Sequence, residues 1–447
     1  MSATSADLDG PLHYDAVVIG AGTAGLTAAI RLAQAGADVC VLAKGVGSTH
    51  LAPATIDVLG RLEGDELVSG PGAALKRLIA ARPDHPYALI GAAVVAESLR
   101  WFAEMVAAAP PRGYEYVGGL ERNLMLPTAI GVLRPSALVP TTMAAGEAGG
   151  LHRVAIAGTP ALRDFHPSMC AANLREVGIE ARAVRLALEL ERADTSALGV
   201  ARRFDDPTWR AAFCARLSAA LGAEDHVGLP AILGLHDPAA VLADVERRLG
   251  RPVFEIPTLP PSVPGMRLYE ILRSALRAAG GRLVIGAEVV SGDRCGDRIE
   301  SVATRAAGRE ARYAAPWFVL ASGGLASGGI ELDSHWTAHE RVLGLRLCGV
   351  PALGEPRFVP DFFAEQPLGR AGVAVDAQLR AEGTVNVLVA GAALPGQAPW
   401  REGCGEGVAI ASGYRAAQVL ALKSGAARAD AADTAPAVPR VNTAEAA

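Results

Sequence analysis

Three glycines near the amino terminus have the spacing of a nucleotide-binding turn. Gly20, Gly22 and Gly25 form a G-x-G-x-x-G motif between an apolar predicted strand at 16–19 and a predicted helix at 22–34. In that context the first glycine permits a tight turn, the second lets the backbone approach a phosphate, and the third lets the helix pack closely on the strand. The helix N-terminus offers unpaired N–H groups and about half a positive charge to an anion. The motif therefore predicts a bound nucleotide cofactor, in preference to an ordinary Gly-rich turn.

The acidic residue that usually accompanies this motif is missing. A carboxylate about 20 residues further on normally accepts hydrogen bonds from the ribose of an adenosine. Here the second predicted strand ends at Ala43, followed by Lys44, and Asp38 stands at the opposite end of that strand. Two interpretations stay open: an adenosine-bearing cofactor that is held more weakly, or a mononucleotide whose single phosphate lies at the helix N-terminus. We favour the mononucleotide FMN and keep FAD as the alternative.

A second glycine-rich segment lies near the carboxyl end of the chain. A predicted strand that ends at Gly391 is followed by a loop and a Gly-rich helix start. Flavoproteins of the glutathione-reductase type complete their cofactor pocket in this way, often with an acidic residue after the strand glycine, where this chain has Ala392. Three glycines would let the backbone approach the flavin ring: Gly403, Gly405 and Gly407. The alternative is a helix N-terminus that only packs on the sheet.

Three further side chains stand beside these glycines. Lys44 and His50 follow the second predicted strand, where this architecture brings the chain to the flavin, and we count both as cofactor-binding candidates. Cys404 lies within the Gly-rich helix start and joins them by position. It has no resolving cysteine and no neighbouring histidine, which favours a packed thiol over a redox group. The residues do not identify a catalytic base.

Other polar residues give weaker signals. Arg134, Arg267 and Arg401 stand in Gly- and Pro-rich segments and could bind a substrate phosphate bidentately, although an ordinary surface ion pair is the simpler interpretation of each. His335 and His339 are four residues apart and could share a helix face. Without a third ligand they predict a surface pair, and we expect no metal site.

The composition narrows the class of protein. The chain has 447 residues, a formal net charge of -5 and no basic tract, which argues against a nucleic-acid partner. Its six cysteines are widely spaced with no CxxC, so neither an iron–sulfur cluster nor a structural zinc site is predicted. We recognise no signal peptide or membrane span and expect a cytoplasmic protein, or one that reaches the cytoplasmic face of the inner membrane through partner subunits.

Strands alternate with helices along most of the chain, which predicts an α/β fold with parallel sheets. After the Gly-rich turn, 45–150 is irregular apart from a helix near 92–107, and a new α/β pattern begins around residue 151. A Pro-rich joint at 256–265 returns the chain to the first pattern. We expect a Rossmann-like flavin-binding domain, made of 13–150 and 258–424, with an inserted α/β domain at 151–257 and disordered tails at 1–12 and 425–447.

Taken together, these segments make the chain similar to the B subunits of anaerobic, quinone-linked glycerol-3-phosphate dehydrogenases, which it resembles over nearly its whole length. The resemblance rests on the first Gly-rich segment and on STHLAPATIDVLG, HPYALIG, IPTLPPSVPGMRL, LASGGLASGG, DFFAEQPLGRAGVAVD and REGCGEGVA. It departs from the family pattern at Ala52, Pro53 and Ala54, where a Ser- and Gly-rich stretch contacts the flavin.

The resemblance implies a flavoprotein, with FMN as the assigned flavin. It implies two partners, a larger flavin-bearing catalytic subunit and a membrane-associated iron–sulfur subunit, that together oxidise sn-glycerol 3-phosphate to dihydroxyacetone phosphate and pass electrons to quinone. Two rival interpretations remain. One is a non-catalytic flavin-fold scaffold or electron relay within that complex, and the other is a stand-alone flavin oxidoreductase with a different small substrate.

Overall fold

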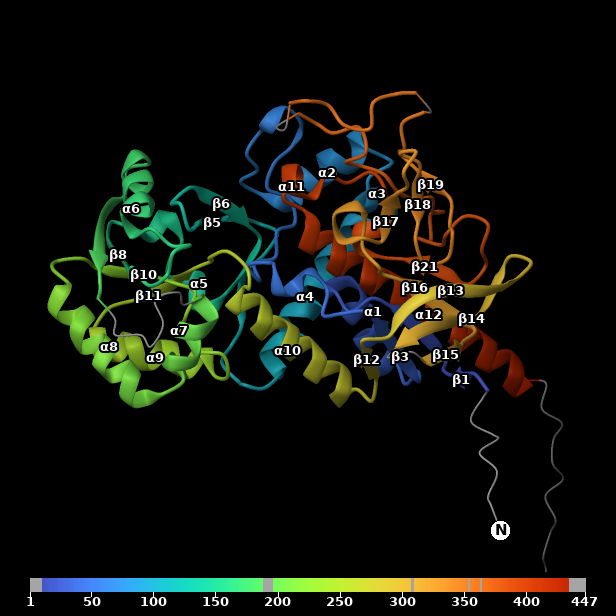
Figure 1. The fold of residues 1–447 in the computed structure, drawn as a ribbon, viewed down its shortest axis with the longest axis horizontal. Coiled ribbons are helices and arrows are strands. Elements are labelled where there is room, and N and C mark those ends of the chain that lie inside the picture. Colours follow the sequence, from blue (N-terminus) through green and yellow to red (C-terminus); the bar gives the residue numbers. More distant parts are fainter. Residues whose placement is uncertain (1–9, 188–195, 307–308, 353, 362–363, 434–447) are drawn as a thin grey trace, which may run out of the picture.

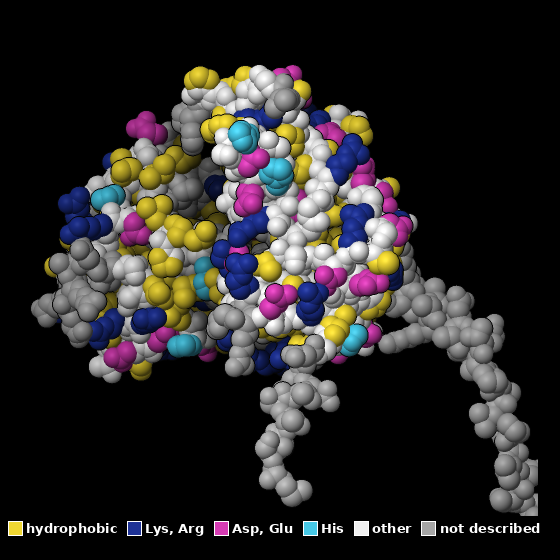
Figure 2. Space-filling model, turned by 45° about the vertical axis from the view of Figure 1, so that its right-hand side comes forward, with side chains coloured by type: hydrophobic (Ala, Val, Ile, Leu, Met, Phe, Trp, Pro, Cys, Tyr) yellow, Lys and Arg dark blue, Asp and Glu magenta, His cyan; other side chains and the backbone are white. Residues whose placement is uncertain are grey.

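The computed structural model describes residues 10–187, 196–306, 309–352, 354–361 and 364–433. Most of the two expected tails, 1–9 and 434–447, lies outside the described residues. The described parts of the expected tails are ordered. Leu12 belongs to a strand, and the last helix continues to Asp433, beyond residue 424 where we expected the folded part to end. The described molecule has two lobes (Figure 1), and a hollow separates them on the face that Figure 2 shows.

The larger lobe is built around a parallel sheet. Its strand order is β12 (Arg282–Ile285), β3 (Val39–Ala43), β2 (Ala16–Ile19), β16 (Trp317–Leu320) and β21 (Val387–Val389). Numbered along the chain within this sheet, the order is 3-2-1-4-5, the Rossmann arrangement. The order reverses between β2 and β16, and ligands of such sheets bind beyond the carboxyl ends of the strands at that reversal. The Rossmann-like α/β fold predicted from the sequence is confirmed.

Helices and a second sheet pack around this parallel sheet. The four longest helices of the lobe are α1 (Thr23–Gln34), α4 (Ala92–Ala108), α10 (Val263–Ala278) and α12 (Gly405–Asp433). The second sheet has the order β1 (Leu12–His13), β15 (Arg309–Ala314), β14 (Arg298–Ala306) and β13 (Glu288–Cys295). Val302 and Tyr313 of that sheet share one hydrophobic core with Val17 of β2, so these layers form a single folded unit.

The segment expected to be irregular, 45–150, carries more structure than the sequence suggested. Besides α4 it holds η1 (Ser48–His50), α2 (Pro71–Ala81), α3 (Pro86–Ile90), β4 (Tyr116–Gly118), β5 (Leu124–Pro127), β6 (Leu133–Ser136), β7 (Leu138–Pro140) and α5 (Thr141–Ala144). The strands pair in two small antiparallel ribbons, β4 with β7 and β5 with β6. Short elements of this kind depend on tertiary pairing and leave little periodic signal in the sequence.

The smaller lobe has its own parallel sheet and core (Figure 1). The strand order is β11 (Val253–Ile256), β10 (His226–Pro230), β8 (Arg153–Gly158) and β9 (Glu180–Arg185), with helices α6 (Pro167–Glu176), α7 (Ala197–Phe204), α8 (Pro207–Ala220) and α9 (Pro238–Leu249). Ala129, Leu133, Ala145 and Ala148 also pack on this core, so the contacts of this lobe begin before residue 151. The apolar run at 230–235 predicts a strand there, but β10 begins four residues earlier, at His226.

The remaining described elements lie between β16 and α12. They are the two-stranded pairs β17 (Ile330–Leu332) with β18 (Ala338–Glu340) and β19 (Leu347–Cys348) with β20 (Gly372–Val373), the short helix α11 (Pro399–Glu402), and the 3₁₀ turns η4 (Leu325–Ser327) and η5 (Gly391–Ala393). Among the described helices, none is long and apolar enough to cross a bilayer.

Candidate flavin site

The Gly-rich turn after β2 has the geometry of a phosphate cradle. Gly20 adopts φ +114°, and a Cβ added there would lie 2.2 Å from the carbonyl oxygen of Ala321, so only glycine fits. A Cβ on Gly25 would lie 2.0 Å from the carbonyl oxygen of Gly20, which shows how closely α1 packs on the turn. A Cβ on Gly22, in contrast, would meet no atom within 4 Å. The space in front of the α1 N-terminus is therefore open, as an approaching phosphate requires.

Two unpaired polar atoms lie at the same edge of the sheet. Nε2 of His50, in η1 after β3, and Oγ of Ser322, after β16, are buried with no hydrogen-bond partner among the described residues. Buried polar atoms seldom lack a partner in folded proteins. Burial lowers the pKa of His50, although the charge of Glu270 opposes this effect. A polar ligand along this edge would satisfy both atoms, and a flavin nucleotide with its phosphate at the cradle fits that requirement.

Helix α10 holds the His50 loop in place. The N–H of Ser262 donates to the carbonyl oxygen of His50 at 2.8 Å. A Cβ on Gly265 would lie only 2.1 Å from the carbonyl oxygen of Thr49, so the helix start presses directly on η1. The ring of Tyr269 stands edge-on to the imidazole with the centroids 4.9 Å apart, and its hydroxyl is likewise buried without a partner among the described residues.

Lys44 is directed elsewhere in this structure. Its Nζ pairs with Oε1 of Glu288 at 3.1 Å, on the side of β3 that faces β12 and β13, whereas the cradle lies on the side of β2. Ala43 is buried at the end of β3, and no carboxylate stands at its position. Ala392 is exposed at the corresponding place after β21. The two alanines singled out in the sequence therefore both lie at strand ends on the ligand edge of the sheet.

The start of α12 extends beyond this edge. Gly391, at φ +73°, would bring a Cβ within 2.8 Å of the Ala24 side chain, and its N–H donates to Oγ of Ser412 at 2.8 Å. Ser412 lies about two turns into α12, so those turns project past the end of β21. Gly403 ends α11 in the left-handed conformation, at φ +59°, and Gly405 follows as the first residue of α12. These glycines lie on the ligand side of the sheet, and their contact with a flavin stays a prediction.

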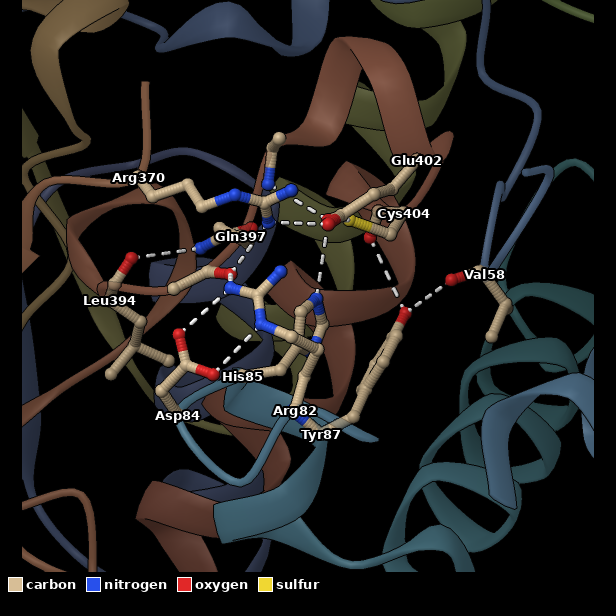
Figure 3. Close-up of polar contacts among 12 residues, drawn as sticks. Val58, Arg82, Asp84, His85, Tyr87, Arg370, Leu394, Gln397, Glu402 and Cys404 are labelled. Atoms are coloured by element: carbon tan, nitrogen blue, oxygen red, sulfur yellow. Dashed lines mark hydrogen bonds and ion pairs between the residues drawn. The ribbon is translucent and has the colours of Figure 1, made fainter. Parts of the chain in front are cut away.

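A buried polar network fixes the loop that leads into α12 (Figure 3). The carboxylate of Glu402 accepts hydrogen bonds from Arg370 at 2.5 Å, from the N–H of Ala398 at 2.8 Å and from the ring of His85 at 3.3 Å. Burial alone would raise the pKa of Glu402, but the donors, His85 foremost, lower it to about 2. The network joins α3 to the α11 region, because His85 caps α3 and Glu402 belongs to α11. The two residues are 317 positions apart in the sequence.

The same network places three possible metal ligands together, but hydrogen bonds within the network already occupy them. Atoms of His85, Glu402 and Cys404 lie within 4.8 Å of one another. Nδ1 of His85 accepts the N–H of Tyr87 at 3.1 Å, so the neutral ring carries its proton on Nε2 and has no lone pair there for a cation. Burial raises the pKa of Cys404 well above its ordinary value, and its Sγ donates to Glu402 at 3.4 Å. A metal would require the thiolate.

The three arginines proposed for substrate phosphate differ in their surroundings. Arg134 binds Asp57 through Nε at 2.9 Å and leaves about half of its side chain exposed. Arg267 lies in α10 and not in a loop, and it is buried against Glu255 with Nη1–Oε2 at 2.6 Å, so its candidacy is withdrawn. The guanidinium of Arg401 lies 5.5 Å from the centroid of the Trp400 ring.

The two histidines expected on one helix face do not lie on a helix. His339 belongs to β18 and pairs with Asp333 at 3.1 Å, while His335 precedes that strand in a turn. Both side chains are exposed. The helical interpretation of their spacing was wrong because this segment turns back as a two-stranded pair.

Sequence reasoning missed the acidic groups of this region. Asp57, Glu402 and Glu406 converge near the start of α12, and none of them was a candidate. Two of them were visible as acidic residues within the glycine-rich stretch REGCGEG, where a charge among glycines is a signal in itself. Asp57 could not be found that way, because its partner Arg134 lies 77 residues further along the chain.

Comparison with known proteins agrees with this geometry. Residues 15–408 match the protein family described as FAD binding domain. The chain is thus a flavin-binding protein of the α/β oxidoreductase class. The description names FAD and gives no support to FMN, the flavin that we favoured from Ala43.

Curated relatives identify the family more closely. The B subunit of the anaerobic glycerol-3-phosphate dehydrogenase of Yersinia enterocolitica is 32% identical over 422 residues, covering 92% of this chain and 98% of the relative. The protein of the same name from Pectobacterium atrosepticum is 33% identical, covering 93% and 100%. A probable B subunit from Halobacterium salinarum is 33% identical, covering 92% and 98%. The chain belongs to the family of anaerobic glycerol-3-phosphate dehydrogenase B subunits.

Solved structures give a more distant likeness. Sdh1 of Mycobacterium smegmatis in complex with UQ1 matches with 12% identity and a TM-score of 0.42, covering 97% of this chain and 74% of the other. FrdA of the E. coli quinol fumarate reductase matches with 9% identity and a TM-score of 0.42, covering 95% and 74%. Both TM-scores lie below 0.5, so no functional conclusion rests on these structures.

Proposed function

We propose that this chain carries a flavin in a quinone-linked glycerol-3-phosphate dehydrogenase and takes part in oxidising sn-glycerol 3-phosphate to dihydroxyacetone phosphate. The observation that carries the proposal is the open phosphate cradle at Gly22, which lies where the strand order of the parallel sheet reverses. The family that the chain matches is described as FAD binding domain. We take FAD as the flavin for the same reason. The relatives are named as B subunits, which supports the presence of partners, and we propose a larger flavin subunit and a membrane-associated iron–sulfur subunit for that role.

When bound, the flavin would supply the two-electron chemistry by accepting hydride from the C2 carbon of the substrate. The residues of this chain would bind and position it. The N–H groups at the α1 N-terminus would hold a phosphate, and Nε2 of His50 and Oγ of Ser322 would pair with polar groups of the ligand. Arg134 stands half exposed near the start of α12 and is the arginine best placed to meet a substrate phosphate.

We also propose that residues 13–150 and 258–424 form the flavin-binding domain and that 151–257 form an inserted domain. The separate hydrophobic core of the smaller lobe supports this division. The contacts of residues 129–148 with that core suggest that the insertion is anchored by the preceding ribbons.

The experiment has two steps. The mass of the chromophore released by acid from the purified chain identifies the flavin. In the second step the complex is assembled once with this chain and once with its Gly22→Val variant. sn-Glycerol 3-phosphate is then added without oxygen, and the loss of visible flavin absorbance is measured in each complex. Bleaching that requires the wild-type chain supports the proposal. Full turnover with a flavin-free variant would assign the chain to the scaffold role instead, and turnover that falls while the flavin in the larger subunit is still bleached would indicate an electron relay.

A further inference from the structure

A charged pair lies against the first turn of α12. The buried carboxylate of Asp57 is held by Arg134, through Nε at 2.9 Å and a shorter contact from Nη2, by Thr55 at 3.1 Å and by a short hydrogen bond from Ser136. Only about 1% of the Asp57 surface is exposed. Both of its oxygens accept hydrogen bonds from these donors, so the carboxylate is held in place beside the helix.

Glu406 stands next to this pair without a donor of its own from another side chain. It occupies the first turn of α12, where the N–H of Gly407 donates to the carbonyl oxygen of Asp57 at 3.0 Å. A Cβ on Gly407 would lie 2.8 Å from Cα of Val58, so the helix start is pressed against the Asp57 loop. Among the described residues no side chain hydrogen-bonds to the Glu406 carboxylate, and the residue is partly exposed.

The surroundings of Glu406 favour proton uptake near neutral pH. Burial raises the pKa of Glu406 and the charge of Asp57 raises it further, whereas a hydrogen bond from the backbone N–H of Glu406 and the charge of Arg134 oppose both, with the result at about 7. The other titratable groups that interact with it are Tyr87 of α3, Tyr116 of β4 and Cys404. Burial raises the pKa of each of these three well above its ordinary value, so they stay neutral over the same range.

The helix places this carboxylate on the ligand side of the sheet. Ser412 is level with the end of β21 because its Oγ accepts the N–H of Gly391. Glu406 lies six residues earlier, which at 1.5 Å per residue is roughly 9 Å further along the axis, beyond the carboxyl edge. Gly403 and Gly405 precede it in the sequence and Gly407 follows it. A flavin with its phosphate at the α1 cradle extends along this same edge.

We propose that Glu406 is the proton acceptor linked to reduction of the flavin in this chain, and that it takes the hydroxyl proton when a secondary alcohol is the reductant. In that reaction the C–H bond breaks with transfer of hydride to the oxidised flavin, the O–H bond breaks with transfer of its proton to the carboxylate, and the remaining electron pair forms the carbonyl bond. Flavin is reduced, the alcohol is oxidised, and Glu406 becomes a neutral acid. The substrate part of this inference rests on the proposed function. The link between proton and flavin rests only on the proposed flavin binding and not on the substrate.

The midpoint potential of the bound flavin tests the link without substrate. Reduced flavin carries more negative charge, which raises the pKa of a nearby carboxyl, so above about pH 7 reduction should take up one more proton in the wild type than in Glu406→Gln. For a two-electron couple each tenfold change in proton concentration adds about 30 mV per extra proton. The wild-type potential should therefore fall more steeply by about 30 mV per pH unit. Asp57→Asn should move the start of this steep range to lower pH, because it removes a negative charge beside Glu406.

Identical slopes in the wild type and Glu406→Gln would overturn the inference. Glu97→Gln, in which the changed carboxylate hydrogen-bonds to Tyr414 further along α12, is the matched control and should keep the wild-type slope. In the assembled complex Glu406→Gln should also lower kcat/KM for sn-glycerol 3-phosphate by about 10²- to 10⁴-fold, the usual range for loss of a general base. If the substrate fails to reduce the wild-type flavin, the proposed function falls, while the potential measurement still decides the role of Glu406.

Discussion

At the scale of single residues, the glycine turn has one position, Gly22, where a side chain would fit the fold but would block binding of the flavin phosphate. Gly20 and Gly25 would clash with backbone oxygens if they gained a Cβ, whereas Gly22 faces open space. Gly22→Val should therefore fold normally and lose its flavin, because the new side chain fills the path of the phosphate. Flavin content after gel filtration, with circular dichroism as the test of folding, measures this.

Gly150→Val is the matched control, since that glycine also has nothing within 4 Å of an added Cβ and lies away from the cradle. It should retain full flavin content. A Gly22→Val protein that retains it too would remove the cradle assignment.

The missing carboxylate at position 43 makes a separate prediction about flavin preference. A hydrogen bond to a charged acceptor contributes about 1.5–3 kcal/mol, which corresponds to roughly 10- to 150-fold in affinity. Ala43→Glu should lower the dissociation constant of FAD by up to that factor, because it supplies a ribose partner. The dissociation constant of FMN should not change, because FMN has no adenosine ribose. Titration of the apo-protein with each flavin gives the two dissociation constants.

Ala43→Gln keeps the shape without the charge and should give a smaller gain, since neutral hydrogen bonds contribute only about 0.5–1.5 kcal/mol. Equal effects of Ala43→Glu on both flavins would show that the adenosine ribose does not reach the end of β3.

The residues that could be predicted from sequence were those whose role depends on local geometry. The turn glycines and His50 follow directly from the strand–turn–helix pattern, and they lie together at the ligand edge. The acidic groups could not be found in this way. Glu402 meets His85 across 317 positions, and the environment of Glu406 depends on Asp57 and Arg134 from two other segments. Only the folded chain brings these charges together.

At the scale of elements, predictions succeeded where the chain carries its own boundary signals. Helix α9 has Asp237 as N-cap accepting from Ala240, Pro238 in its first turn and Gly250 in the left-handed conformation at its end, all visible in the sequence. Strand β10 was placed too late because the apolar run continues past Pro230 and only its pairing with β8 and β11 selects His226–Pro230. Helix α2 was missed within a Gly- and Pro-rich stretch, although Pro71 opens it.

The contact between helix α10 and strand β11 gives a prediction about stability. Arg267 binds Glu255 with two nitrogens and the carbonyl oxygen of Gly234 with two, in a fully buried arrangement that joins the two lobes. Removing one partner of a buried ion pair leaves an uncompensated charge and costs about 3–5 kcal/mol. Arg267→Met should lower the free energy of unfolding by this amount in denaturant titration. Arg277→Met, on the exposed side of the same helix, should change it little.

The double change Arg267→Met with Glu255→Leu separates charge from packing. It should recover most of the loss, because replacing a buried pair with apolar residues is often neutral. If the double variant is no more stable than Arg267→Met, the pair contributes through its backbone contacts and not through charge compensation.

At the scale of the whole molecule, three large apolar side chains are exposed on segments that adjoin the candidate site. Leu51, next to His50, Leu259, in the Pro-rich joint that leads to Ser262, and Trp400, in α11, are each more than half exposed. Large apolar side chains exposed around a site are typical of surfaces that a partner covers. The relatives are named as subunits, which agrees with such an arrangement. The isolated chain would therefore leave a flavin in contact with water at the place where the reaction needs a dry, closed pocket.

The last prediction follows from this exposure. Dye-linked oxidation of sn-glycerol 3-phosphate by the purified single chain, loaded with flavin, should be far slower than oxidation by the complex reconstituted with its other subunits at equal flavin concentration. The difference should appear mainly in kcat, because closing the site strengthens electrostatic interactions in the transition state more than it strengthens binding. A complex assembled with Glu406→Gln serves as the control, since it restores closure without the proton acceptor and should stay slow. Comparable rates for the single chain and the wild-type complex would show that this lobe closes its own site and needs no partner for the chemistry.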